Sequence, residues 1–412
     1  MNLAINRPRV VMAHPHLNAN VREASLALAE SGLLDQFHTT IDTTTLARLL
    51  GNSRLGKQMM RRSLPPTVHR VTRQHPSTEI ARLLRRRLTG SDSSRSYAPD
   101  GPAHAIDARA ARSVTSSTSA VYAYEDSALE MFIAAERHGA SRIYDLPIGY
   151  WRAADEILGQ ERDLQPDWAA TLIGPQLADQ RSRLQRKDDE LALADHIVVA
   201  STFVRDTLSL ADDFTATVTV IPYGAPQSLS PSLARQDVGP LRALYVGGLS
   251  QRKGISYMFD AVESLGANVT LTVVGQPVAP CAELERHLGQ ANVKYIRSLP
   301  HSQILGLMAQ HDVLIFPSLF EGYGLVITEA LSQGLPVIAT PHSAAPDVID
   351  DAIDGWVVPI RSSEAISSKL QQLITSSDLR EEMRMAALNK AQSLRWEDYR
   401  NSVSKLVGGA TR

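Results

Sequence analysis

Two glutamates flank a glycine-bearing turn in the second half of the chain. In the stretch SLFEGYGLVITEALSQGLPVIAT, Glu321 precedes two glycines and Glu329 follows them. Glycines before a helix are typical of an anion-binding backbone, because free amides and the positive end of the helix dipole face the ligand. Carboxylates repel anions but accept hydrogen bonds strongly from hydroxyls. The stretch therefore favours a ligand with both phosphate and hydroxyl groups, although a cap or dipole contact also explains a glutamate near a helix start.

A second motif has the opposite charge. In YVGGLSQRKGISYMF, a predicted strand runs into Gly247 and Gly248, followed by Arg252 and Lys253 and then a helical segment. Glycines let the backbone approach closely, and a guanidinium and an ammonium neutralise phosphate as a fork and a point charge. A basic loop after a strand is the plainer interpretation. Because both motifs follow strands of one predicted domain, together they indicate a nucleotide sugar, whose diphosphate lies between two hydroxyl-bearing ends.

The elements that position these motifs alternate between strand and helix. Short apolar runs ending in turn residues predict buried parallel strands, and the segments between them have helical spacing. The predicted strands fall in Arg9–Pro15, Ala120–Asp126, Ser141–Pro147, His196–Ser201, Val218–Gly224, Leu241–Gly248, Val269–Gly275, Val313–Ser318 and Pro336–Thr340. The predicted helical segments include Asn20–Leu34, Ser127–Gly139, Asp189–Asp195 and Tyr257–Gly266. This alternation predicts an α/β chain that is doubly wound twice.

The length of 412 residues predicts two domains. The Pro-, Ser- and Gly-rich segment Gly224–Pro240 is the best boundary, because it separates two predicted strands. Ligands of open α/β sheets bind beyond the carboxyl ends of the strands, so two such domains facing each other would form a cleft for two substrates.

Composition and charge exclude several classes of protein. With 43% hydrophobic and 21% charged residues and a net charge of -2, the chain is typical of an ordinary globular protein. The single cysteine, Cys281, cannot form an internal disulfide and lacks the spacing of a metal or redox site. Neither a signal peptide nor a run of about 20 apolar residues is evident. We therefore expect a cytoplasmic protein.

One basic segment departs from this neutral composition. Residues 54–87 hold ten Arg and Lys residues against the single acid Glu79, with interleaved apolar residues. Basic amphipathic helices there would suit an anionic membrane face, giving peripheral association with the inner face of the cell membrane, or an anionic acceptor. A solvated surface is the equally simple alternative. The segment lacks aromatic residues for stacking, which argues against nucleic acid as a partner. The following stretch, Thr89–Pro102, is typical of a loop that could cover a cleft.

The second half of the chain resembles a known family. EGYGLVITEALSQGLPVIAT resembles the E-x7-E signature of glycosyltransferase family 4, and VGGLSQRKGI resembles the donor-diphosphate loop of that family. The resemblance covers most of Leu241–Val358 and extends weakly to LRWEDYRNSVSKLV, which is similar to the last helix that crosses back to the first domain. It implies the GT-B fold, with two Rossmann-like domains facing across a cleft. The implied domains are 1–225 with 395–412 for the acceptor, and 226–394 for the nucleotide sugar.

The resemblance also implies roles for the motif residues. Glu321 would hold hydroxyls of the donor sugar, and Glu329 would hold those of the ribose. Lys253 with Arg252 would stabilise charge on the leaving nucleoside diphosphate. The backbone amides facing sugar and phosphate would be those of Gly322, Tyr323, Gly324 and Leu325. No metal and no cofactor other than the donor substrate is implied. Gly248 stands where many members have another arginine, so the demand on the Arg-Lys pair is greater.

The first half departs from the family pattern. Instead of a glycine-rich acceptor loop after the first strand, it has AHPHLNANVREAS, where His14, His16 and Asn18 supply polar groups for the acceptor. Where many members have a histidine after a middle strand, this chain has SRIYDLPIGYW, with Tyr144 and Asp145. Asp145 is the first candidate for handling a proton and His14 the second. Packing or capping are the alternatives for the histidines, and core packing is the stronger interpretation for Tyr144.

Three further polar residues after strands are interpreted as structural. Glu125 and Asp126 are explained by capping of the helix that follows them. Ser201 is expected to cap a helix beside the cleft.

The predicted activity is retaining transfer of a hexose from a nucleotide diphosphate sugar to an acceptor hydroxyl of a glycan or lipid-linked glycan. Same-face departure and attack, in which the leaving diphosphate helps to take the acceptor proton, makes a side-chain base unnecessary. One alternative is a nucleotide-sugar epimerase of the same fold, which needs a second acid beside Glu321. Another is a non-catalytic donor-binding subunit. A sugar phosphorylase would need a longer chain and a pyridoxal lysine, neither of which is evident.

Overall fold

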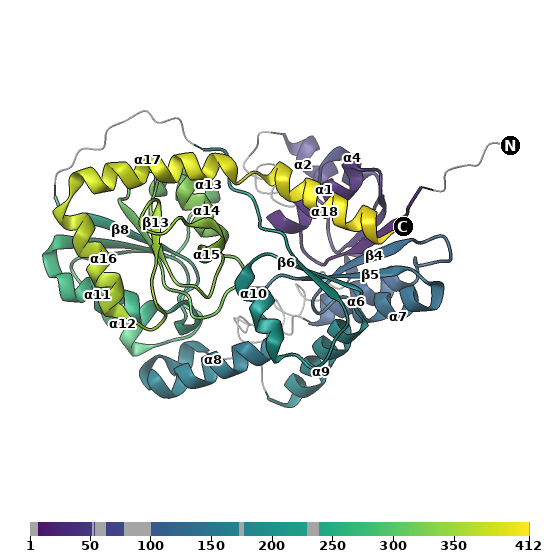
Figure 1. Cartoon of the computed structure of the whole chain (residues 1–412), viewed down its shortest axis with the longest axis horizontal. Helices are drawn as coiled ribbons and strands as arrows, with labels where there is room; N and C mark the ends of the chain where they lie inside the picture. The colour runs from purple at the N-terminus through teal and green to yellow at the C-terminus, as the bar shows by residue number, and fades with distance from the viewer. Residues whose placement is uncertain are drawn as a thin grey trace.

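The chain folds into two α/β domains, each built on a parallel sheet (Figure 1). The computed structural model describes residues 7–51, 53, 63–77, 100–172, 177–228 and 239–411. Within them, the first sheet has seven strands in the order β3-β2-β1-β4-β5-β6-β7, and the second has six in the order β10-β9-β8-β11-β12-β13. Both orders reverse direction beside the first strand of the sheet, which is the doubly wound arrangement. The predicted fold class is confirmed.

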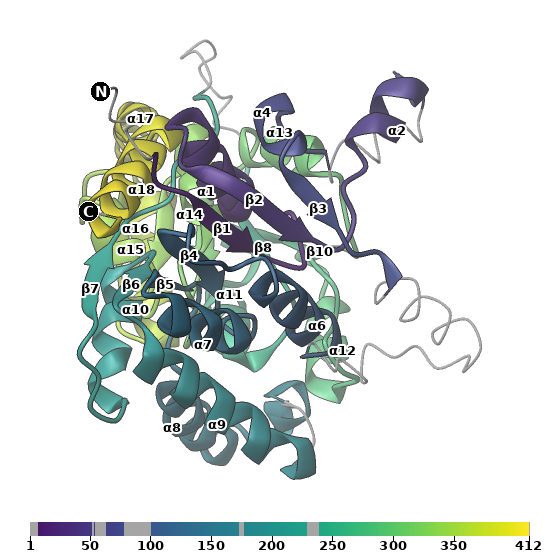
Figure 2. The same ribbon diagram turned by 90° about the vertical axis from the view of Figure 1, so that its right-hand side faces the viewer.

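Figure 2 shows the strands of the first sheet together with the helices that cover it. Its strands are β1 Val10–Ala13, β2 Leu34–Thr39, β3 Thr72–Gln74, β4 Ala120–Tyr124, β5 Ser141–Leu146, β6 His196–Val199 and β7 Thr217–Val220. Its helical segments are α1 Ala19–Glu30, α2 Thr44–Leu50, α4 Pro66–His69, α6 Asp100–Ala111, α7 Leu129–His138, α8 Trp151–Leu164, η2 Pro166–Leu172, α9 Leu177–Leu193, α10 Thr202–Thr207 and η3 Leu208–Leu210.

The second sheet has shorter connections. Its strands are β8 Leu241–Val246, β9 Val269–Val274, β10 Val293–Ile296, β11 Val313–Phe316, β12 Val337–Ala339 and β13 Gly355–Val357. Its helical segments are η4 Gln251–Lys253, α11 Ile255–Leu265, η5 Gly266–Asn268, α12 Ala282–Leu288, α13 His301–Met308, α14 Leu325–Ser332, α15 Ala345–Val348, α16 Ser363–Thr375 and α17 Ser377–Ser393. Every predicted strand is observed, and β2, β3, β10 and β13 were not predicted.

The central strands are buried on both faces. All residues of β1, β4 and β11 are buried, as the continuous apolar runs require in a parallel sheet covered by helices on both sides. One core cluster includes side chains of both domains, among them Tyr124, Tyr223, Tyr323 and Tyr399. The two domains therefore share a packed junction.

Two segments connect the domains beyond the linker itself. The last helix, α18 Trp396–Ala410, follows α17 and lies along α1 of the first domain (Figure 1). There Arg400 Nη1 lies 2.6 Å from Glu23 Oε2, and Ser404 Oγ donates to Ala27 O at 2.9 Å. The other segment, α8 with η2, runs from the first domain along the second and lies beneath it in Figure 1. In the described part of the chain, no helix is long and apolar enough to cross a membrane.

Candidate active site

The glycine loop after β8 is packed against two neighbouring strand ends. A Cβ on Gly275 would lie 1.7 Å from Gly247 O, so only glycine lets these turns approach. Gly254 has φ +64, and a Cβ there would lie 2.0 Å from Pro317 O, after β11. The amide of Leu319 also donates to Arg252 O at 2.9 Å. Glycine-specific contacts thus bring the two sequence motifs together.

The cations of the first motif meet the carboxylate of the second. Lys253 Nζ contacts Glu321 Oε2, and Arg252 Nη1 lies 3.8 Å from the same oxygen. Arg252 Nη1 also donates to Phe320 O at 2.7 Å. Burial and the adjacent Arg252 lower the pKa of Lys253 well below that of a solvated lysine. The three residues form one charged group at the start of the turn before α14.

The turn itself is shaped for a helix N-terminus. Gly324 has φ +84 and precedes the eight residues of α14, which begins at Leu325. A Cβ on Gly322 would lie 1.8 Å from Pro147 O of the first domain. The hydroxyl of Tyr323 donates to Tyr223 O at 2.7 Å, so this side chain faces the interdomain linker.

Glu329 has a partner that the sequence did not reveal. His301 Nε2 lies 2.8 Å from Glu329 Oε1, and the two side chains are 58% and 18% exposed. His301 is the first residue of α13, and it lies 28 residues before Glu329, so no local motif joins the two. The Glu329 carboxylate is therefore partly exposed to solvent, with the His301 ring as its neighbour.

The first domain contacts the same turn through the segment after β6. Ser201 accepts from Val204 N at 3.3 Å, which confirms its predicted role as the cap of α10. Its hydroxyl also donates to Gly322 O at 2.6 Å, across the domain junction. Beside it, Thr202 N donates to Asp347 Oδ2 at 2.8 Å, a residue that the sequence did not single out. The carboxyl ends of β5, β6 and β11 therefore meet at Gly322.

The polar residues after β1 have distinct environments. His14 is partly exposed, and its Nδ1 accepts from His16 N at 2.9 Å. Its ring lies edge-on to Tyr124, with centroids 4.7 Å apart, and burial lowers the pKa of His14 to about 3. His16 is exposed, and Asn18 caps α1 by accepting from Val21 N at 3.4 Å. His14 is thus a neutral imidazole at pH 7.

Tyr144 and Asp145 lie on opposite faces of β5. Tyr144 is 1% exposed, stacks edge-on against Phe132, and places its hydroxyl 3.4 Å from Glu190 Oε2 in the core. Asp145 is 2% exposed and accepts from Tyr122 Oη at 2.7 Å. Burial raises the pKa of Asp145 to about 7, against the opposing effect of that hydrogen bond. Neither side chain is open to solvent.

The interpretation that Glu125 and Asp126 cap the following helix is wrong. The amides at the start of α7 are bound by carboxylates from other helices: Glu190 accepts from Ala128 N at 3.0 Å, and Asp107 accepts from Met131 N at 2.9 Å. Burial raises the pKa of Glu190 to about 8.

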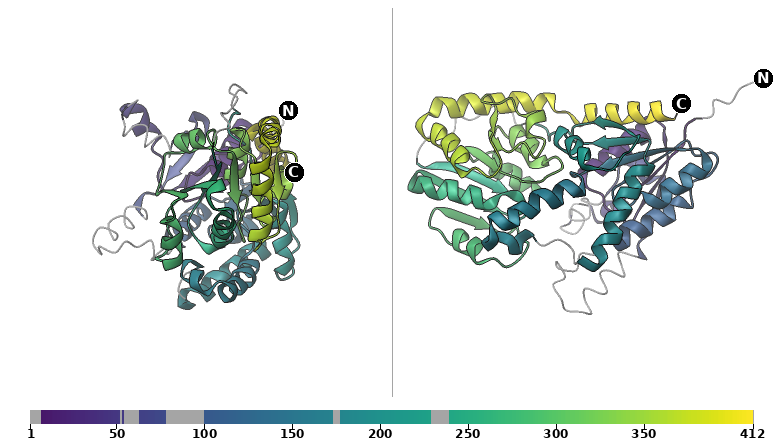
Figure 3. Two further views of the ribbon diagram at one scale, coloured as in Figure 1. Left: turned by 90° about the vertical axis from the view of Figure 1, so that its left-hand side faces the viewer. Right: turned by 60° about the horizontal axis from the view of Figure 1, so that its bottom comes forward.

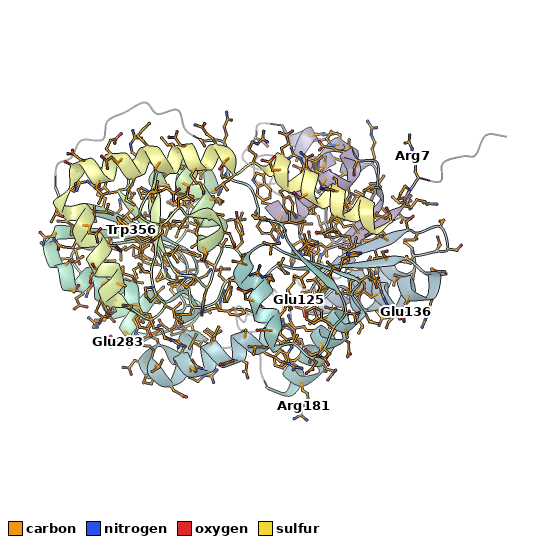
Figure 4. All side chains as sticks on the ribbon, viewed as in Figure 1. Arg7, Glu125, Glu136, Arg181, Glu283 and Trp356 are labelled. Atoms are coloured by element: carbon orange, nitrogen blue, oxygen red, sulfur yellow. The ribbon has the colours of Figure 1, made fainter. Side chains whose placement is uncertain are left out.

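Glu125 has a different partner. Lys187 Nζ of α9 lies 2.7 Å from Glu125 Oε2 and 3.4 Å from Asp126 Oδ1. In Figure 4, Glu125 is labelled on the side of the first domain next to α10. Glu125 and Lys187 therefore form an ion pair at the carboxyl end of β4, and the amides of α7 donate to Glu190 and Asp107 instead.

Two other predictions fall mainly on residues that the structure does not describe. Of the basic segment 54–87, residues 54–62 and 78–87 lie outside the described residues, as do 89–99 of the predicted loop. Within the described ranges, no group of three or more His, Cys, Asp or Glu side chains could hold a metal ion. The membrane contact and the loop over a cleft stay predictions.

A protein-family model matches most of the second domain. Residues 234–390 match the model of Glycosyl transferases group 1. The chain is 28% identical over 147 residues to the amylovoran biosynthesis glycosyltransferase AmsK of Erwinia amylovora, which covers 32% of this chain and 36% of that protein. It is 28% identical over 170 residues to the O-antigen chain mannosyltransferase B of Escherichia coli, and this match covers 38% of this chain and 42% of that protein. The chain thus matches less than half the length of these curated relatives.

Solved structures match over nearly the whole chain. The structure of Alr3699/HepE from Anabaena in complex with UDP-glucose has a TM-score of 0.63 and 17% identity, and the match covers 97% of this chain and 99% of that one. At this identity the likeness shows the fold. The chain therefore contains a glycosyl transferases group 1 domain within a GT-B fold.

Proposed function

We propose that this protein is a retaining glycosyltransferase of family 4, which moves a hexose from a nucleotide diphosphate sugar to an acceptor hydroxyl. The observation that carries the proposal is the contact of Arg252 and Lys253 with Glu321 at the start of α14. That arrangement joins cations for a diphosphate to a carboxylate for sugar hydroxyls. Amylovoran and O-antigen synthesis in the names of the relatives supports a glycan or lipid-linked glycan as acceptor, in cell-surface polysaccharide or glycoconjugate synthesis.

The donor would lie along the two glycine turns. Its diphosphate would lie against the backbone of Gly247 and Gly248 and be held by the cationic pair, with the N-terminus of α14 adding favourable dipole charge. Glu321 would accept hydrogen bonds from the transferred sugar. Glu329, with His301 beside it, would accept those of the ribose. A bound diphosphate would compete with Glu321 for Lys253 and so release the carboxylate toward the sugar.

The chemistry would need charge stabilisation more than a strong base. The bond between the anomeric carbon and the diphosphate oxygen breaks, and the acceptor oxygen forms a bond on the same face. The two cations would stabilise the negative charge that grows on the leaving diphosphate. The acceptor proton would pass to a diphosphate oxygen, because a pKa of about 3 makes His14 a weak base and Asp145 is buried beneath the hydroxyl of Tyr122. No step in this scheme requires a metal.

The acceptor would approach from the first domain. After β1, His16 is exposed and His14 is partly exposed, so we propose that these two side chains contact the acceptor directly. Asn18 would contribute to acceptor binding by fixing the start of α1, which it caps. Tyr144 is buried, so it would contribute only by packing beneath β5. We also propose a cytoplasmic location with peripheral attachment through the basic segment 54–87. Salt-sensitive sedimentation with anionic but not neutral vesicles tests the attachment.

A donor and acceptor screen tests the proposed activity. Purified protein is incubated with UDP- and GDP-sugars and acceptor glycans, and we expect release of nucleoside diphosphate, an unchanged anomeric configuration in the product by NMR, and full activity in EDTA. Glu321→Gln and Lys253→Met should each reduce turnover by about 100-fold, as removal of a preorganised charge contact does. Donor binding without turnover would support a donor-binding subunit instead. Isomerised nucleotide sugar without acceptor would support an epimerase.

A further inference from the structure

The segment Trp151–Leu172, called the arm below, belongs to the first half of the sequence but packs on the second domain. Its start is fixed to the first domain, where Trp151 Nε1 donates to Asp188 Oδ1 at 2.6 Å. Its end lies in the core of the second domain, where Trp168 stacks on Phe259 with centroids 6.1 Å apart. Figure 3 (right) shows α8 spanning this distance. The arm therefore connects the two domains on the side opposite to α17 and α18.

A fully buried carboxylate lies where the arm meets the second domain. Glu161 is 0% exposed and accepts three hydrogen bonds from the second domain. The donors are Gln251 Nε2 at 2.7 Å, Tyr257 Oη at 3.0 Å and Arg361 Nε at 2.7 Å. A buried carboxylate is strongly unfavourable unless it is paired and hydrogen-bonded, so this full set of partners specifies one arrangement.

The residue that Glu161 holds lies directly before the cationic pair. The side-chain amide of Gln251 is bonded on both sides, because its Oε1 accepts from Ser256 N at 3.1 Å while its Nε2 donates to Glu161. The backbone is held as well, since Gln251 N donates to Thr171 Oγ1 at 2.8 Å. The arm thus fixes both the main chain and the side chain at the start of η4.

Arg361 of the second domain also binds the arm. Its guanidinium bonds Glu161 through Nε and donates to Ile157 O through Nη2 at 2.9 Å. Its backbone has φ +60, a conformation that residues other than glycine rarely adopt. Such a conformation persists only where the surroundings over-determine it, and it is enriched at functional sites. The contacts to the arm supply that constraint.

We infer that Glu161 is a positioning residue for Arg252 and Lys253, and that the arm sets the position of the phosphate-binding loop from the first domain. The identity of the ligand that the two cations bind rests on the proposed function. The contacts by which the arm fixes the loop do not depend on that proposal. In Glu161→Gln one accepting oxygen becomes an amide nitrogen, so Gln251 Nε2 or Arg361 Nε loses its partner on the arm and the hold on η4 weakens. Because Lys253 follows Gln251 by two residues, a shift of η4 moves the ammonium relative to the diphosphate.

Glu161→Gln tests this inference, because it keeps the shape and removes the charge. Glu156→Gln is the matched control, since Glu156 is an exposed carboxylate on the same helix. Tyr257→Phe, which removes one hydrogen bond to Glu161, is the milder variant. For each protein we would measure kcat, donor and acceptor KM, UDP and GDP affinity by calorimetry, amide hydrogen exchange of residues 250–256, and the melting temperature.

The expected result separates positioning from stability. Glu161→Gln should lower kcat by roughly 10- to 100-fold, as misplacement of a catalytic group by about 1 Å does. It should also weaken nucleoside diphosphate binding and speed exchange of residues 250–256, with acceptor KM unchanged. Tyr257→Phe should show the same pattern more weakly, and Glu156→Gln should match the wild type.

Two results distinguish this inference from the proposed function. Wild-type turnover, affinity and exchange in folded Glu161→Gln would overturn the inference and leave the proposed function intact. A wild-type protein that binds no UDP, GDP or nucleotide sugar would overturn the proposed function, and exchange of residues 250–256 would then decide the inference alone. If Glu161→Gln does not fold, an unchanged loop in Tyr257→Phe overturns the inference, and faster exchange supports it.

Discussion

Replacing Gly322 by alanine tests whether the contact between the domains sets the geometry of the active site. The added Cβ would lie 1.8 Å from Pro147 O and 2.8 Å from Pro147 C, whereas Cβ contacts shorter than 3.0 Å essentially do not occur. The two backbones must therefore separate by about 1.2 Å, the difference between 3.0 and 1.8 Å. Both obstructing atoms belong to the main chain, so no side-chain rotation relieves the clash.

That displacement acts on the charged group next to it. Glu321 directly precedes Gly322, and a shift of about 1 Å in a reacting group lowers turnover by roughly 100-fold. Overpacking of this kind destabilises by about 1–3 kcal/mol, which leaves a domain of ordinary stability folded. We therefore expect Gly322→Ala to lower kcat by about 100-fold while the protein stays folded at 25 °C.

Steady-state release of nucleoside diphosphate measures this effect, and calorimetry of UDP or GDP binding shows whether the donor still enters. Gly159→Ala is the control, because a Cβ at that position of α8 meets nothing within 4 Å. It should leave kcat unchanged and stabilise the helix by about 0.5–1 kcal/mol. Wild-type kcat in Gly322→Ala would refute the reasoning that the junction positions Glu321.

Three further changes test other parts of the structure. Because burial raises the folded-state pKa of Asp145 to about 7, above an unfolded value of about 3.9, its contribution to stability is fully present below the unfolded pKa and is lost as the pH rises to 7. Asp145→Asn should flatten the fall in melting temperature between about pH 4 and pH 7, whereas the exposed control Asp155→Asn should follow the wild-type curve. Parallel curves for Asp145→Asn and the wild type would contradict this. Glu329→Gln should raise donor KM by roughly tenfold, because a charged hydrogen bond contributes about 1.5–3 kcal/mol, and an unchanged KM would exclude it from donor binding. Glu190→Ala should lower the free energy of unfolding by about 1–2 kcal/mol through loss of its cap on α7, as measured by urea denaturation, and no change would show that Asp107 suffices.

The strands that the sequence revealed are those with continuous apolar runs. β1, β4 and β11 are buried throughout, and period and composition suffice to find them. β2, with the sequence LDQFHT, has polar residues at positions that the sheet only half buries. β10, VKYI, lies at the edge of the second sheet and is exposed in its middle. Their pairing partners decide that these segments are strands, and partners distant in sequence leave no local pattern.

The same distinction separates the site residues that were predicted from those that were not. Arg252, Lys253 and Glu321 belong to local motifs in which glycine spacing indicates a ligand, and the structure brings their side chains together. Glu161 contacts Gln251 from 90 residues away. In the sequence Glu161 is one of several acids on a polar helix. It differs from Glu156 only in the folded protein, where it is buried and accepts three hydrogen bonds.

The junction also explains why a buried carboxylate can be tolerated in β5. Asp145 lies among the tyrosines that join the domains: Tyr399 of α18 packs on Tyr223 of the linker, with centroids 5.4 Å apart, and Tyr223 packs on Tyr323 at 4.9 Å. Tyr323 in turn is adjacent to Gly322 and donates to the linker carbonyl. In the folded protein the glycine turn, which resembles a local anion motif, contacts Pro147 after β5, Ser201 after β6 and Tyr223 after β7, so its geometry depends on both domains being in place.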